Sequence, residues 1–427
     1  MTIASEKDKI LKLIRREVVP AIGCTEPVAV ALAVARAAEI LGALPEKIQV
    51  YLSANVLKNA MGVGIPGTGM IGLPIAIALG ALVGKSEYQL EVLKNITPEA
   101  LEAGKKMMDK KRIFVLLKED TEDKLYIEAI CSGGDNQSRV IIRHHHTNIC
   151  FEERNGQVLS DTQQESGDEI DELPVKLTLK KVYDFSMETP LDEISFILDS
   201  GRMNKNAALE SFKHNFGHAL GKTLIGKYKN QVMGDGLLSK MLSYTSAACD
   251  ARMAGAMIPV MSNSGSGNQG LATTLPVIVF AEETNQPEEK LIRALMLSNL
   301  TVIYIKQNLG RLSALCGCVV ASTGSSCGIT YLMGGGYKEI TFAVKNMIAN
   351  LTGMICDGAK PSCSLKVTSG VSTAVFSAMM AMEGKSVTSV EGIIDEDVDQ
   401  SIRNLTSIGK EGMNETDRLI LRIMTCK

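Results

Sequence analysis

Cysteines are the residues of this sequence whose type and spacing most directly suggest chemistry. Four of the ten fall in two short C-terminal segments, with Cys316 and Cys318 in CGC and Cys356 and Cys363 in CDGAKPSC. Thiolates are soft ligands for zinc and for iron–sulfur clusters. The spacing does not fit the two close pairs of a structural zinc site. Three ligands from separated loops would leave one iron of a [4Fe–4S] cluster open, but unlinked core cysteines fit the spacing equally well.

Cys24 stands apart from this group, in the segment GCTEP. A break rich in proline and glycine precedes it, and an Ala-rich helical run follows, with Thr25 as the expected N-cap and Gly42 as the expected C-cap. A helix N-terminus stabilises a thiolate and lowers the pKa of the thiol. Cys24 is therefore a candidate base or nucleophile, and a buried residue beside the cap is the alternative.

A glycine-rich loop, SGSGNQG at 264–270, offers successive backbone N–H groups with little side-chain bulk. Such a nest can hold a carboxylate or a phosphate, although an ordinary glycine-rich turn has the same composition. The loop matches neither the P-loop nor the dinucleotide-binding pattern. The candidate binding residues here are Ser264, Gly265, Gly267 and Asn268.

Three consecutive histidines, 144–146, end a strand-like run. On a strand, His144 and His146 would share a face, which would allow two-ligand zinc binding. A solvated strand end without metal is the more common arrangement.

The overall composition excludes several classes of protein. The 427 residues predict two or three domains, and 45 Lys and Arg against 48 Asp and Glu give a net charge of −3. No broad basic field is available for nucleic acid or anionic lipid, and the absence of Trp removes stacking platforms for single strands. The N-terminus has no signal-peptide pattern, so we expect a cytoplasmic protein, where clustered cysteines more often serve metal binding or catalysis than disulfides.

Three stretches, 59–84, 253–281 and 312–337, carry no charge and are long enough to cross a membrane. Their many Gly, Pro and Ser residues would leave backbone groups unsatisfied in lipid. We therefore expect no membrane partner, and we interpret these stretches as the walls of a dry active-site cavity.

The elements that position these residues follow from hydrophobic periodicity. Helices are expected over 5–18, from Thr25 to Gly42 and near 97–110, and strand patterns occur at 47–55, 112–120, 124–133 and 138–153. An acidic segment, 160–172, is typical of a solvated loop or linker. Beyond residue 192 helical patterns dominate, and the apolar run 276–280 is an exception that resembles a strand.

This order predicts an α+β protein, in which a small α/β module precedes a largely α-helical C-terminal catalytic domain. The predicted parts are N-terminal helices at 1–44 that carry Cys24 and pack with the C-terminal domain, an α/β domain at 45–185, and a cluster-binding helical domain at 190–427.

Five segments together resemble a known superfamily, in family order and over nearly the whole chain. They are VVPAIGCTEPVAVALA, MGVGIPGTG, SGSGNQG, RLSALCGCVVASTGSSCGITYLMGGG and MICDGAKPSCSLKVTSGV. The sequence resembles the iron–sulfur-dependent serine dehydratase alpha-chain superfamily, and most closely the L-cysteine desulfidase family and its uncharacterised bacterial relatives. The resemblance implies a β-elimination without pyridoxal phosphate, in which a [4Fe–4S] cluster held by three cysteines acts through its open iron as a Lewis acid on an amino acid.

The resemblance also implies roles for individual residues. Cys24 would be the proton acceptor, and Cys356 and Cys363 would be cluster ligands. The third ligand would be Cys316 or Cys318, of which we choose Cys316. The SGSGNQG nest would hold the substrate carboxylate, and His146 would line the same pocket. The short C-x6-C spacing is similar to that of the desulfidase branch.

The expected reaction is therefore conversion of L-cysteine to pyruvate, ammonia and sulfide by a lyase, with a small amino acid as ligand and a homodimer as the assembly. L-serine dehydration at the same site, or a non-enzymatic thiol-rich or cluster-binding protein, are the alternatives. Cys426 is either a temporary fourth ligand brought by a mobile tail or part of a frayed end. The remaining cysteines are expected in the core: Cys131, Cys150, Cys249 and Cys327.

Overall fold

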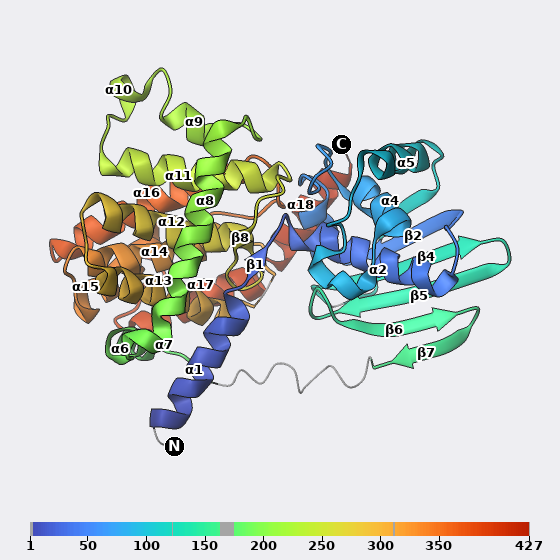
Figure 1. The fold of residues 1–427 in the computed structure, drawn as a ribbon. Helices are drawn as coiled ribbons and strands as arrows, with labels where there is room; N and C mark the ends of the chain where they lie inside the picture. Colours follow the sequence, from blue (N-terminus) through green and yellow to red (C-terminus); the bar gives the residue numbers. More distant parts are fainter. Residues whose placement is uncertain (1–2, 122, 163–174, 311, 427) are drawn as a thin grey trace.

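The protein consists of a sheet-bearing half and a helical half, which lie side by side in Figure 1. The computed structural model describes residues 3–121, 123–162, 175–310 and 312–426. The strands gather in the N-terminal part of the chain and the C-terminal part is helical, so the predicted α+β class is confirmed. The acidic segment expected as a linker lies, from residue 163 onward, outside the described residues.

A six-stranded sheet forms the first half, in the order β3-β2-β4-β5-β6-β7. Only β2 and β3 pair in parallel among these neighbours. The four strand patterns are confirmed, but the last of them is a hairpin whose turn holds the histidines, so His144 and His146 do not share a strand face. The strands are β2 (Lys47–Leu52), β3 (Ile113–Leu117), β4 (Tyr126–Gly133), β5 (Asn136–Arg143), β6 (Ile149–Arg154) and β7 (Gln157–Asp161).

Helices α2 and α4 cover one face of this sheet, and α5 packs on α4 (Figure 1). The Ala- and Val-rich α2 is buried almost all round, because α4 packs on one side of it and β4 and β5 on another. Its C-cap is Gly42, as predicted, but its N-cap is Cys24, because Thr25 is already helical. The helical elements of this half are α2 (Thr25–Leu41), α3 (Ala54–Ala60), α4 (Leu73–Val83), η1 (Ser86–Glu91) and α5 (Pro98–Asp109).

Helix α14 is the centre of the helical half and packs against α12, α13, α15 and α16. It approaches α13 closely at Gly324, where a Cβ atom would lie 2.5 Å from the carbonyl oxygen of Ser298. The helical elements here are α1 (Ile3–Glu17), α6 (Leu179–Glu188), α7 (Leu191–Ile194), η2 (Ser195–Ile197), α8 (Leu198–Lys213), α9 (Leu220–Leu224), α10 (Lys229–Val232), α11 (Leu237–Met253), α12 (Gly267–Glu283), α13 (Glu288–Leu309), α14 (Gly317–Leu332), α15 (Tyr337–Leu351), α16 (Cys363–Met382), α17 (Val398–Ser407) and η3 (Ile408–Gly412).

The apolar run 276–280 is helical and lies inside α12, with Pro276 within the helix. Every residue of α12 from Gln269 to Ala281 is buried, so the helix has no polar face that would produce a helical period in its sequence. On this side of the molecule β1 (Pro20–Ala21) and β8 (Val260–Met261) pair as a two-stranded antiparallel ribbon.

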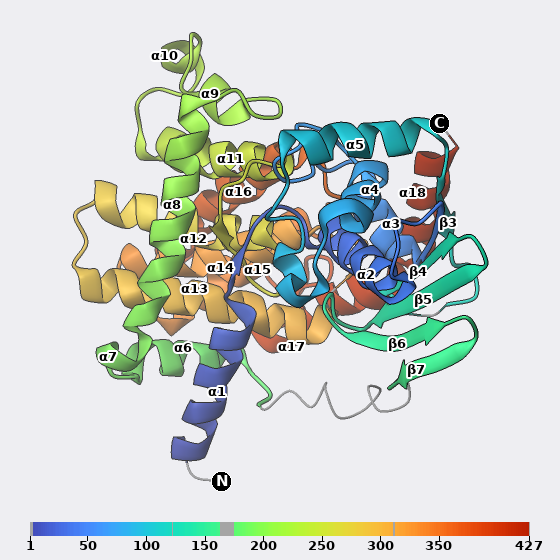
Figure 2. The same ribbon diagram turned by 45° about the vertical axis from the view of Figure 1, so that its right-hand side comes forward.

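The chain passes between the two halves more than once. Helix α1 contacts α13 in the helical half, whereas α2 packs on the sheet, so the segment predicted at 1–44 contributes to both. Residues 175–185 join the helical core. The last helix, α18 (Asn414–Thr425), packs against α3 in the sheet-bearing half, as Figure 2 shows. The domain boundaries at residues 45, 185 and 190 remain a prediction.

Among the described residues, α16 is the one helix long and apolar enough to cross a membrane. Half of that apolar window is buried, and α16 packs against α11, α14 and α15. A single helix of this kind is weak evidence for a span, since core helices of soluble proteins share its length and composition. The cytoplasmic location remains a prediction.

Candidate active site

Five of the cysteines line one small cavity of about 110 Å³, which we call the thiol pocket. They come from chain segments nearly 340 residues apart in the sequence. The set contains every residue predicted as catalytic base or cluster ligand: Cys24, Cys316, Cys318, Cys356 and Cys363.

Helix starts bring these thiols together. Cys24 and Cys316 are the N-caps of α2 and α14, and Cys363 is the first residue of α16. Cys356 lies beside Cys316 because two backbone hydrogen bonds join the segments: Cys316 N donates to Met354 O at 2.9 Å and Cys356 N to Ala314 O at 2.6 Å. Helix N-termini carry partial positive charge, which favours anionic sulfur at this point.

The CGC pair is electrostatically unequal. The Sγ atoms of Cys316 and Cys318 are 3.3 Å apart. Hydrogen bonding from Cys318 lowers the pKa of Cys316 to about 7, against the effect of burial, with further lowering by Lys366 and Lys360. The same contact raises the pKa of Cys318 well above its usual value. Cys316 is therefore the member of the pair that forms a thiolate more readily.

Three lysines surround the other two thiols. Burial raises the pKa of Cys356 to about 11, and it raises that of Cys363 as well, but positive charge opposes both shifts. The fully buried Lys58 donates from Nζ to the Cys356 carbonyl oxygen at 3.2 Å. Lys360 and Lys366 act on Cys363 in the same direction. The surroundings of the thiols thus compensate negative charge on sulfur.

Cys24 donates a hydrogen bond from Sγ to Glu26 Oε2 at 2.8 Å, and both residues are buried. Burial, together with the negative charge of Glu26, raises the pKa of Cys24 well above its usual value. The prediction that the helix start lowers this pKa is wrong, because desolvation of the thiolate outweighs the partial charge of the helix end.

Glu26 is the partner that sequence reasoning missed. It also accepts hydrogen bonds at 3.2 Å from Thr25 Oγ1 and from Asn59 Nδ2. Burial opposes its ionisation, but the charge of His146 and the hydrogen bond from Cys24 outweigh burial and lower the pKa of Glu26. His146 thus acts on the carboxylate instead of lining the thiol pocket. A carboxylate two positions after a cysteine at a helix start was the available signal.

The loop 264–270 lies between this cavity and a neighbouring one. Gly265 and Asn268 line the thiol pocket, whereas Ser264 lines the larger cavity described below. Gly267 is covered by an arginine, since a Cβ atom there would lie 2.1 Å from Arg252 Nε. A close approach of this kind requires glycine.

Arg252 is a second residue that sequence reasoning missed. It is 4% exposed, lines the thiol pocket from α11, and donates from Nη1 to Asn268 Oδ1 at 3.0 Å. In the part of the chain that the structure describes, Arg252 Nε, Asn59 Oδ1 and Gln269 Oε1 are buried without a hydrogen-bond partner. All three residues line the thiol pocket. Because unpartnered buried polar atoms are costly, they indicate a polar ligand.

The donor set fits an iron–sulfur cluster better than a single ion. No group of three or more His, Cys, Asp or Glu side chains within the described residues is arranged to hold one metal ion. A cluster distributes its cysteines over separate irons, so the thiols need not converge on one point. Soft sulfur donors and a positive surround suit such a cluster.

The cysteines outside the thiol pocket differ in burial. Those expected in the core are buried, and Cys426 is exposed and does not line the pocket. The four buried cysteines are Cys131, Cys150, Cys249 and Cys327.

Comparison with known proteins supports the resemblance found in the sequence. The family model for the serine dehydratase alpha chain matches residues 87–422. The chain is 70% identical over 423 residues to a UPF0597 protein of Bacteroides fragilis and 58% identical over 429 residues to one of Porphyromonas gingivalis. It is 45% identical over 423 residues to one of Oleidesulfovibrio alaskensis, and each comparison covers 99% of both chains. The chain therefore belongs to the serine dehydratase alpha-chain family.

Proposed function

We propose that the protein is a lyase that removes the β-substituent of a small L-amino acid, converting L-cysteine to pyruvate, ammonia and sulfide. Family membership supports a serine dehydratase-like lyase of amino-acid catabolism. The observation that carries the proposal is the thiol pocket, which combines a buried thiol–carboxylate pair, four further thiols and a buried arginine with an unpartnered donor.

Arg252 is suited to hold the substrate carboxylate. Its charge is buried, and its Nε hydrogen has no acceptor among the described residues. Charge-assisted hydrogen bonds from a guanidinium to a carboxylate are strong and fix orientation. The unpartnered oxygens of Asn59 and Gln269 can accept from the substrate ammonium group.

Proton transfer uses Cys24 and Glu26 together. The thiol passes its proton from Sγ to Glu26 Oε2 across the 2.8 Å contact, and the thiolate then takes the substrate Cα proton. The electron pair left on Cα forms the Cα–Cβ double bond as the β-substituent departs with its own bonding pair. The enamine product tautomerises and hydrolyses to pyruvate and ammonia.

Cys316, Cys356 and Cys363 would hold a [4Fe–4S] cluster, and Cys318 would stay protonated beside Cys316. When bound, such a cluster supplies a Lewis acid for the substrate carboxylate and β-heteroatom. The positive charges of Lys58, Lys360 and Lys366 offset the charge of the ligated thiolates. A soft metal favours sulfide as the leaving group, which is why we place L-cysteine before L-serine.

The test is an anaerobic assay of the full chain with iron and acid-labile sulfide counted. The proposal expects bound iron and release of equimolar sulfide and pyruvate from L-cysteine. Pyruvate from L-serine without sulfide from L-cysteine would support the dehydratase alternative. A cluster-loaded protein that forms neither product would reject the lyase in favour of a cluster-binding protein.

A further inference from the structure

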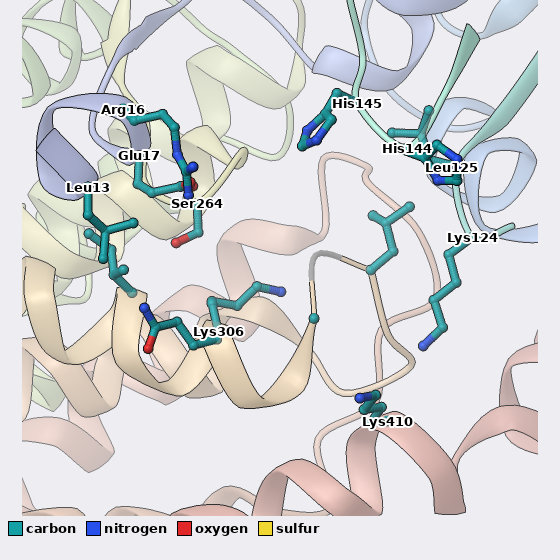
Figure 3. A pocket seen from close by; sticks show the side chains of 14 residues that line it. Leu13, Arg16, Glu17, Lys124, Leu125, His144, His145, Ser264, Lys306 and Lys410 are labelled. Atoms are coloured by element: carbon teal, nitrogen blue, oxygen red, sulfur yellow. The ribbon is translucent and has the colours of Figure 1, made fainter. Parts of the chain in front are cut away.

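A second cavity, of about 430 Å³, lies beside the thiol pocket and is lined by positively charged side chains; we call it the cationic pocket. It is lined by residues of α1, α13 and η3 and by residues at the open end of the β4–β5 hairpin, where β4 begins and β5 ends; Figure 3 shows these side chains. The side chains of Lys124 and Lys306 extend into the space between these elements (Figure 3). The basic lining residues are Arg16, Lys124, His144, His145, Lys306 and Lys410.

Negative charge in this cavity is scarce. Among the described lining residues Glu17 is the single acidic one, and Arg16 binds it at 2.9 Å. Neither Lys124 nor Lys410 has a carboxylate within 4.0 Å in the described part of the chain. Burial lowers the pKa of Lys124. The negative charge of Asp417 opposes this shift, and the positive charges of Lys410 and Lys58 add to it. Lys124 and Lys410, which have no carboxylate within that distance in the described part of the chain, favour binding of an anion.

The size and charge of the cavity define the class of ligand. A volume of about 430 Å³ is that of a small-molecule site, and it exceeds the space that one simple ion needs. Several cations spread over opposite walls match a molecule with more than one anionic group. We propose that the cationic pocket binds a small polyanion, either a phosphate ester or a polycarboxylate.

Two connections link this ligand to the chemistry of the thiol pocket. Ser264 lines the cationic pocket, and its backbone N–H donates to Glu17 O at 3.0 Å, while the next residue, Gly265, lines the thiol pocket. His144 and His145 line the cationic pocket, and the adjacent His146 acts on Glu26. A ligand here would therefore shift the groups that orient substrate and proton, so it would act as an effector. This second step rests on the proposed lyase activity, whereas binding itself does not.

The test is titration calorimetry on the full chain at low salt, with inorganic pyrophosphate and citrate as separate probes. Three proteins are compared: wild type, the double variant K124Q/K410Q, and the control K227Q/K290Q, whose lysines lie outside the pocket lining. We expect wild type and control to bind one probe at least, and K124Q/K410Q to bind it about 100-fold more weakly, since each charged contact contributes about tenfold. Affinity should also fall as salt is raised.

The preferred probe identifies the ligand chemistry. Tighter binding of pyrophosphate supports a phosphate ester, and tighter binding of citrate supports a polycarboxylate. Absence of binding by both probes overturns the proposal, and so does equal binding by wild type and K124Q/K410Q. Because calorimetry needs no turnover, a protein that binds the probe but releases neither sulfide nor pyruvate keeps the binding proposal and rejects the lyase.

Discussion

The thiol pocket and the cationic pocket adjoin each other but are built in opposite ways. The thiol pocket holds about 110 Å³ and is lined by three buried and two half-buried thiols, three amide side chains and one buried arginine. The cationic pocket holds about 430 Å³ and is lined by two half-buried lysines, an exposed lysine, an exposed arginine and two half-buried histidines. Thiols whose pKa values are shifted, and buried polar atoms that have no hydrogen-bond partner among the described residues, lie in the smaller cavity.

This difference shows that cavity size and chemistry are separate properties. A larger cavity gives room and charge complementarity, which suffice for binding. Bond breaking needs groups held in desolvated and unequal environments, as Cys316 and Cys318 or Cys24 and Glu26 are held here. The experiments below test this division of roles.

Removing one thiol of the thiol pocket should have the largest effect. In Cys363→Ala we expect turnover to fall to background, roughly a thousandfold or more, because the Lewis acid contributes several kcal/mol to transition-state stabilisation. Bound iron and the visible absorption of the protein should fall in parallel. Anaerobic product assays and iron counting measure both effects.

Cys327→Ala is the matched control for that variant. Cys327 is fully buried in α14 but does not line the thiol pocket. It should keep its iron and its turnover while losing a little stability. If both variants lose the same amount of iron, Cys363 affects iron binding only by stabilising the fold. The thiols of the pocket would then have no role that the core thiols lack.

The sequence predicts one pocket far better than the other. The thiols of the thiol pocket lie in short local motifs, and the family resemblance that these motifs carry singled them out, since their spacing alone fitted unlinked core cysteines equally well. Arg252 gave no such signal, because its role depends on α11 packing against the loop 264–270. The cationic pocket gave none either, since Arg16, Lys124, Lys306 and Lys410 are far apart in a chain with a net charge of −3.

Local patterns also predict elements better than they predict packing. The alternation in the sheet strands is clear because one face is covered by α2 and α4. In α12 burial on all sides removed the helical period, so its Val- and Ile-containing run resembled a strand. The division of 1–44 between the two halves depends on long-range contacts of α1 and α2, which no local pattern contains.

Glu26→Gln tests whether turnover in the thiol pocket depends on the Cys24–Glu26 pair. We expect turnover at neutral pH to fall about 100-fold, because the amide cannot take the thiol proton. The pH profile gives a second readout. In the wild type the ionised Glu26 receives the thiol proton within the pair, so kcat/KM rises where Glu26 ionises. In Glu26→Gln the thiolate forms only when Cys24 loses its proton to solvent, and burial keeps the pKa of that thiol above its usual value, so the rising limb of kcat/KM moves to higher pH.

Thr25→Val controls for simple loss of a hydrogen bond to Glu26, since Thr25 Oγ1 also donates to that carboxylate at 3.2 Å. It should leave the position of the pH limb within experimental error, because it removes no charge. A Glu26→Gln enzyme with wild-type turnover and pH profile would show that Glu26 takes no part in proton transfer.

Arg252→Lys tests the binding side of the thiol pocket and should have a moderate effect. Lysine keeps the charge but loses the planar fork, so we expect KM for the amino acid to rise about 10- to 100-fold with a smaller change in kcat. Arg202→Lys is the control, because Arg202 is exposed on α8. An unchanged KM in Arg252→Lys would assign the carboxylate to the backbone of the loop 264–270 instead.

Asp417→Asn should have the smallest effect on turnover and tests the support shared by both pockets. Asp417 on α18 pairs with Lys58, whose side chain is 2% exposed. Lys58 in turn bonds the Cys356 carbonyl and acts on Lys124 in the cationic pocket. Loss of the acid leaves a buried ammonium without its partner, so we expect the free energy of unfolding to fall by about 3 kcal/mol.

Urea denaturation measures this loss, and Glu415→Gln on the same helix provides the comparison. Glu415 pairs with Arg418, but both side chains are more than 70% exposed, so that change should alter stability by less than about 1 kcal/mol. If the two variants lose the same stability, the buried pair does not support either pocket. A large loss confined to Asp417→Asn would show that α18, at the far end of the chain, stabilises the loop that carries Cys356.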